Sequence, residues 1–90
     1  MSEVARRLRV TGRVQGVNYR AWLRERAVAI GVRGYAANQA DGSVEVWLEG
    51  EAEAVALAEE HARQGPPWGS VDGVEASDEQ PRGLTGFERR

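Results

Sequence analysis

The sequence contains no cysteine and no lysine, and it has a single histidine among 90 residues. Without cysteine the chain can form no disulfide framework, no thiolate nucleophile and no cysteine-based zinc site. Without lysine it cannot form a Schiff base with a carbonyl substrate. A basic excess is missing too, because the formal net charge is −2, which argues against a nucleic-acid partner.

Long apolar runs are also absent, including the run that a signal peptide or a membrane span would need. We therefore expect a cytoplasmic protein with no membrane partner. The length of 90 residues suits one domain, residues 1–90, with one modest core held together by burial alone. No internal repeat or low-complexity linker interrupts it, and we expect a monomer.

Hydrophobic periodicity predicts alternating strands and helices. Residues 6–14 and 44–49 alternate polar with apolar positions, whereas residues 22–30 and 51–64 place apolar side chains at helical spacing. On the strand at 44–49, the alternation predicts that Trp47 and its glutamate neighbours face solvent. Strands are expected at 6–14, 32–38, 44–49 and 71–79, with a short one near Phe87, and helices at 20–30 and 51–64.

This order, βαββαβ, predicts a ferredoxin-like α+β sandwich. Two right-handed β-α-β crossovers place both helices on one face of a four-stranded antiparallel sheet. The segment at 38–43 supplies the hairpin between the two middle strands, since Asp-Gly tolerates the positive φ of a tight turn. The same architecture serves many unrelated functions, so the fold alone cannot decide the activity.

The segment Gly12–Arg20, GRVQGVNYR, carries the most information about function. It reads as the end of a strand, a glycine-bearing loop and the start of a helix, with an arginine at the junction. Consecutive main-chain N–H groups of such a loop can converge on one anion, and the unpaired N–H groups of the helix add to them. Gly16 permits backbone angles that a side chain would oppose, and the planar guanidinium of Arg20 can bind two phosphate oxygens.

The residue pattern of this loop leaves one other interpretation open and excludes another. It could be a tight turn with Arg20 as a solvated residue of the first helical turn. A nucleotide-binding loop is excluded, because neither Gly-Lys-Ser/Thr nor the dinucleotide spacing follows its glycines.

Together with a second block, this segment closely resembles the signature of the acylphosphatases, small enzymes that hydrolyse carboxyl-phosphate bonds. The second block is GYAAN at 34–38, followed by DGSVEV at 41–46 and Glu-Gly at 49–50. The resemblance covers nearly the whole chain and implies the same fold, with no cofactor and no metal. It implies that Arg20 and Asn38 are catalytic. Direct pairing of the strand that ends at Asn38 with the first strand would bring the Asn38 amide beside the loop. It also implies a phosphate cradle made of Gln15, Gly16, Val17, Asn18, Tyr19 and Arg20.

The match departs from the family at a few positions. Many members have Gly-Phe where this chain has Asn18 and Tyr19, and Val-Arg where it has Ala36 and Ala37. Asparagine adopts left-handed backbone conformations more readily than other non-glycine residues, so Asn18 is compatible with the cradle.

Neither block contains a carboxylate or histidine in a catalytic position, which predicts direct in-line attack by a water that Asn38 orients, without a phosphoenzyme. The alternative is a non-catalytic module that binds phosphate or acyl phosphate. A further rival is an RNA-binding domain that stacks bases on Trp47, although Glu45 and Glu49 beside it disfavour a polyanion. His61 belongs to neither block and is expected to pack in part against the core.

Overall fold

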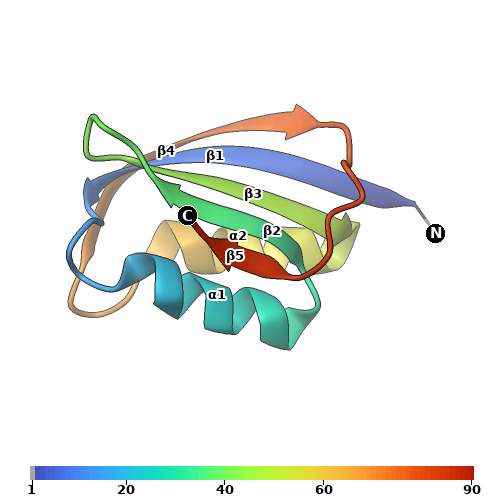
Figure 1. The fold of residues 1–90 in the computed structure, drawn as a ribbon, viewed down its shortest axis with the longest axis horizontal. Helices are drawn as coiled ribbons and strands as arrows, with labels where there is room; N and C mark the ends of the chain where they lie inside the picture. Colours follow the sequence, from blue (N-terminus) through green and yellow to red (C-terminus); the bar gives the residue numbers. More distant parts are fainter. Residues whose placement is uncertain (1) are drawn as a thin grey trace.

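The protein folds into one sheet with both helices packed against the same face (Figure 1). The computed structural model describes residues 2–90. Its elements are β1 (Glu3–Arg13), α1 (Tyr19–Ile30), β2 (Arg33–Asn38), β3 (Val44–Glu51), α2 (Ala52–Gln64), β4 (Ser70–Glu79) and β5 (Phe87–Arg89). The predicted ferredoxin-like α+β fold is therefore confirmed, including the short final strand at Phe87. Neither helix, among the residues described, has the length and apolar content to cross a membrane.

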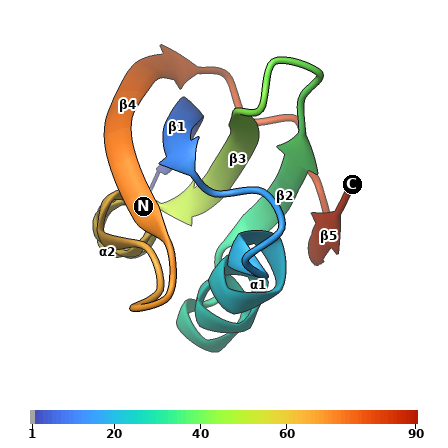
Figure 2. The same cartoon turned by 90° about the vertical axis from the view of Figure 1, so that its left-hand side faces the viewer.

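The strands lie in the order β4-β1-β3-β2-β5. The pairs β4–β1, β1–β3 and β3–β2 are antiparallel, and β5 pairs in parallel with the free edge of β2. Figure 2 shows β5 beside β2, on the side of the sheet where α1 lies. Because β1 and β2 both run antiparallel to β3, their carboxyl ends meet at the same edge of the sheet.

That topology corrects one expectation about Asn38. The sequence suggested that its strand pairs directly with the first strand, but β3 lies between them. The register runs from Val10 to Val44 and from Val44 to Asn38. The physical reason is that the crossover through α1 skips one position in the sheet. β3 occupies that position, between β1 and β2.

The main core lies between the sheet and the helices. One face of the central strands supplies apolar side chains with period 2, and each helix supplies a stripe with period 3.6. Its fully or nearly buried members include Leu8, Val10, Val44, Val46, Leu48, Leu23, Ala27, Val55, Ala58, Ala62 and Phe87. His61 is half-buried against the ring of Trp22, as expected for a packing residue.

The opposite face of β3 is also covered, which corrects the expectation that it faces solvent. Trp47 is 1% exposed and Glu49 is 0% exposed. The segment before β5 crosses this face: the Arg82 guanidinium lies 3.8 Å from the Trp47 ring centre. The Tyr35 ring is nearly parallel to the Trp47 ring, with the ring centres 6.4 Å apart. Trp47 is therefore not available to stack on a nucleic-acid base. Alternation in the strand could not reveal this cover, because the covering segment comes more than thirty residues later.

Candidate functional site

A cavity of about 140 Å³ lies at the edge of the sheet where β1 and β2 end. The residues that line it are Val14, Gly16, Asn18, Arg20, Ala21, Asn38 and Arg89. The fold thus brings together four of the residues that the sequence assigned to function. Three come from the loop after β1 and the first turn of α1, and Asn38 comes from the end of β2.

The loop between β1 and α1 adopts two left-handed backbone conformations. Gly16 has φ 76°, and Asn18 has φ 62° and is the one non-glycine residue with positive φ among residues 2–90. This agrees with the expectation that Asn18 tolerates the left-handed region. Within the same range, no backbone or side-chain acceptor pairs with the main-chain N–H groups of 15–18.

The amino end of α1 leaves further donors without a helical partner. The first hydrogen bond of the helix runs from the Trp22 N–H to the Asn18 carbonyl at 3.1 Å. The N–H groups of residues 19–21 come before this bond and have no acceptor within the helix. The Asn18 side chain makes no capping bond to them. The helix dipole adds partial positive charge at this end. The loop and the helix therefore present a run of main-chain donors next to the cavity.

Side chains from distant segments hold the loop in place. The Gln15 amide Nε2 donates to the carbonyls of Gln39 at 2.8 Å and Ser43 at 2.9 Å, which ties the loop to the β2–β3 hairpin. The Trp68 indole donates to the Val17 carbonyl. The Gln15 side chain and the Val17 carbonyl thus make structural contacts, and neither residue lines the cavity.

Tyr19 likewise points away from the cavity. Its side chain is 1% exposed, and its hydroxyl donates to the Ala62 carbonyl at 2.7 Å. Burial raises the pKa of the Tyr19 hydroxyl well above its usual value of 10, so the group stays neutral. Tyr19 does not line the cavity, so it could contribute only its main-chain N–H to the predicted cradle.

One carbonyl connects Arg20 with the strand that carries Asn38. The Arg20 Nη1 donates to the Arg90 main-chain oxygen at 2.7 Å, and the Asn38 main-chain N–H donates to the same oxygen at 3.1 Å. The Asn38 side chain is exposed and makes no hydrogen bond within residues 2–90. Arg20 and Asn38 are therefore held at the same place, with the Asn38 amide still available.

The β2–β3 hairpin beyond Asn38 is held by Asp41. Its carboxylate accepts bonds from the Ser43 N–H at 2.9 Å and the Ser43 hydroxyl at 2.6 Å, and it pairs with Arg9 at 2.6 Å. The Ser43 hydroxyl, the Arg9 guanidinium and the Ser43 N–H hold the Asp41 pKa far below its usual range. Asp41 thus stays ionised and keeps the turn closed next to Asn38.

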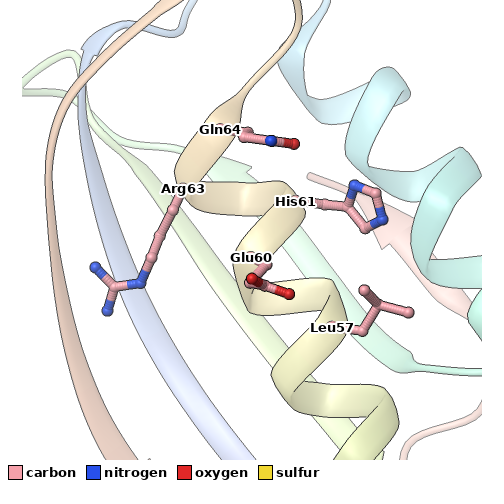
Figure 3. A pocket seen from close by; sticks show the side chains of 5 residues that line it. All are labelled: Leu57, Glu60, His61, Arg63 and Gln64. Atoms are coloured by element: carbon pink, nitrogen blue, oxygen red, sulfur yellow. The ribbon is translucent and has the colours of Figure 1, made fainter.

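A separate cavity of about 380 Å³ lies on α2 (Figure 3). Its walls are Leu57, Glu60, His61, Arg63 and Gln64. None of these residues lines the cavity at Arg20, and His61 points toward α1 in Figure 3. Across residues 2–90, no group of three or more His, Cys, Asp or Glu side chains gathers as metal ligands would.

Arg89 is the charged residue at the site that the sequence patterns missed. It lines the cavity from β5. Alternation within the strand could have placed it on the same face as the buried Phe87, but the sequence could not show that β5 lies next to β2.

Comparisons with known proteins point to one family. A family model described as acylphosphatase matches residues 6–89. The chain is 47% identical over 78 residues to an acylphosphatase from Thermus thermophilus, covering 87% of this chain and 89% of the relative. It is 43% identical over 88 residues to one from Thermococcus kodakarensis, covering 98% and 97%. The structure of an acylphosphatase from Coxiella burnetii superimposes with a TM-score of 0.92 at 28% identity, over 98% of this chain and 93% of that chain.

Proposed function

Because the chain belongs to the acylphosphatase family, we propose that it hydrolyses the carboxyl-phosphate bond of small acyl phosphates at the cavity beside Arg20. The observation that carries this proposal is the composition of that cavity. Gly16, Asn18, Arg20 and Asn38 line one space of about 140 Å³. A cavity of this size has room for a group of a few heavy atoms, such as a phosphoryl group.

The phosphoryl group is bound by main-chain donors and one guanidinium. The N–H groups of Gln15, Gly16, Val17, Asn18, Tyr19 and Arg20 surround its oxygens, and the Arg20 side chain adds charged hydrogen bonds. Each charged hydrogen bond contributes about 1.5–3 kcal/mol before the costs of binding. Donors that are fixed before substrate arrives stabilise the transition state without reorganising, which is the main source of catalysis in such sites.

Asn38 orients the attacking water. Its carboxamide both donates and accepts, so it can hold a water and touch a phosphate oxygen at once. The water attacks phosphorus in line with the departing carboxylate, while Arg20 and the loop amides stabilise the equatorial oxygens. The carboxylate is a weakly basic leaving group that needs no general acid. The substrate phosphate accepts the proton of the water, because no carboxylate or histidine is among the described residues that line the cavity.

Release of inorganic phosphate from acetyl phosphate tests this proposal. Arg20→Ala should weaken the binding of inorganic phosphate and lower kcat/KM together. Asn38→Ala should mainly lower kcat, by about 10²–10³-fold, which is the typical effect of removing one transition-state donor. Arg63→Ala is the matched control, since Arg63 lies on α2 and pairs with Glu59 there.

Two results would contradict the proposal. Near-normal kcat in Asn38→Ala would remove this residue from the chemistry. If the unaltered protein binds inorganic phosphate but releases none from acetyl phosphate, the chain is instead a non-catalytic phosphate-binding module. Binding is measured by calorimetry and turnover by phosphate release, so the two functions are separated.

A further inference from the structure

A second, larger cavity adjoins the one beside Arg20. It has a volume of about 500 Å³ and is lined by Ala21, Arg24, Glu25, Val28 and Arg89. Two of these residues, Ala21 and Arg89, also line the cavity that holds Arg20 and Asn38. The two cavities therefore lie next to each other along α1, and Arg89 of β5 lines both.

The geometry of α1 sets the distance between Arg20 and the residues that line the second cavity. Arg20, Arg24 and Val28 are spaced four residues apart on α1 and so lie on one face of the helix. At 1.5 Å per residue, Arg20 and Arg24 are separated by about 6 Å along the helix axis. A phosphoryl group at Arg20 would thus place an acyl chain of three or four atoms beside Arg24 and Arg89.

Arg89 has no partner of its own within residues 2–90. Its neighbour Arg90, by contrast, pairs with Glu88 at 2.8 Å and lies over the ring of Tyr35. The Arg89 side chain is exposed and makes neither an ion pair nor a hydrogen bond in the described part of the chain. Its guanidinium is therefore available to a ligand in either cavity.

The charges around the second cavity favour an anion. Arg24 is fixed to β5 by a bond from its Nε to the Phe87 carbonyl at 2.8 Å, and its two terminal nitrogens point to no acceptor among residues 2–90. Glu25 is the single carboxylate in the lining, against two guanidinium groups. Val28, which is 54% exposed, offers apolar surface to a short methylene chain.

We infer that Arg89, together with Arg24, forms an anion-binding subsite for the acyl part of the substrate. The enzyme then prefers acyl phosphates whose acyl chain carries a second carboxylate a few atoms from the reacting carbonyl. This inference rests on the proposed function, since it takes the phosphoryl group to bind beside Arg20. Arg89 would act on binding and specificity, whereas Arg20 and Asn38 act on the phosphoryl group.

The first test compares two substrates of equal chain length. Succinyl phosphate carries a terminal carboxylate, and butyryl phosphate ends in a methyl group. The measured quantity is the ratio of their kcat/KM values. We expect Arg89→Gln to lower this ratio about two- to fivefold, the range for an exposed charge pair. Arg89→Lys, which keeps the charge, should give an intermediate ratio, and Arg63→Gln, which removes an equal charge from α2, should leave the ratio unchanged.

A ratio that Arg89→Gln does not change would overturn the subsite. This includes the case in which both substrates lose activity equally, because Arg89 would then act on the phosphoryl group. A fall in the ratio that Arg63→Gln reproduces would also overturn it, since the effect would then be one of net charge.

A binding experiment separates this inference from the hydrolytic function. The probes are 5-phosphonopentanoate and pentylphosphonate, which match the two substrates in length and cannot be hydrolysed. We expect calorimetry to show tighter binding of the carboxylate probe, and Arg89→Gln to abolish the difference. If this result is found in a protein that hydrolyses neither substrate, the subsite stands and the catalytic proposal fails. Equal affinity for both probes overturns the subsite, whatever the enzyme hydrolyses.

Discussion

Replacing Glu49 by alanine should cost more stability than removing any exposed carboxylate, because Glu49 is a buried charge with several partners. Its side chain is 0% exposed. It accepts hydrogen bonds from the Trp47 indole at 2.8 Å, the Arg82 N–H at 3.0 Å and the Leu84 N–H at 2.9 Å, and Arg33 lies 3.7 Å away. The carboxylate therefore fastens the segment before β5 onto β3.

The expected loss follows from these contacts. Removing one member of a buried charged network typically costs about 3–5 kcal/mol, since the remaining groups lose their partner and stay desolvated. With an m value of about 2 kcal/mol/M, the urea midpoint should fall by roughly 1.5–2.5 M. Glu60→Ala is the control: Glu60 is exposed on α2, and its loss should change stability by no more than about 0.5 kcal/mol.

The pH dependence provides a second measure of the same charge. Burial acts to raise the Glu49 pKa, but the hydrogen bonds from Arg82, Trp47 and Leu84 outweigh it and hold the pKa below its ordinary 4.5. A carboxylate with a lowered folded-state pKa stabilises the protein above its unfolded pKa, and this contribution is lost as the pH falls through the folded value. The difference between the unaltered protein and Glu49→Ala should therefore be constant above about pH 5 and shrink below pH 4.5. A loss no larger than that of Glu60→Ala, or a difference that does not shrink in acid, would refute the account.

Two further substitutions test the backbone around the site. Gly34→Ala should abolish cooperative unfolding in circular dichroism, because a Cβ there would lie 1.7 Å from the Trp47 carbonyl oxygen; a variant with normal thermal unfolding would show that β2 and β3 can separate. Asn18→Ala should lower stability by about 1–2 kcal/mol, the cost of a left-handed conformation for an ordinary residue, whereas Asn18→Gly should not. Equal Tm values for the Asn18 variants would contradict the left-handed conformation assigned to this position.

Much of the fold could be predicted from the sequence because its signals are local. Alternation in the first and third strands, helical spacing around Trp22 and the stop at Gly31 each depend on neighbouring residues. Gly31 does end α1 in a left-handed conformation, with φ 88°. The loop after β1 was predictable for the same reason, since Gly16 and Asn18 adopt the backbone region that their residue types favour.

The errors arose where one segment covers another that is distant in sequence. Trp47 and Glu49 alternate with apolar residues and so looked exposed, yet the Arg82 and Leu84 region lies over them. The expectation that the strand of Asn38 pairs directly with the first strand was wrong for a related reason. Strand order depends on how the whole chain closes, and local periodicity contains no record of it.

The short strand β5 contributes to the site through both a local pattern and a long-range pairing. Burial of Phe87 against the helices fixes its register beside β2, and strand alternation then sends Arg89 and Arg90 to opposite faces. Arg89 faces the cavities along α1, while Arg90 lies over Tyr35 and offers its main-chain oxygen to Arg20 and to Asn38. Two identical neighbours in the sequence thus have different roles, one toward a ligand and one toward the site's own architecture. Alternation separates their two faces, but the parallel pairing of β5 with β2, which no local pattern encodes, brings those faces to the site.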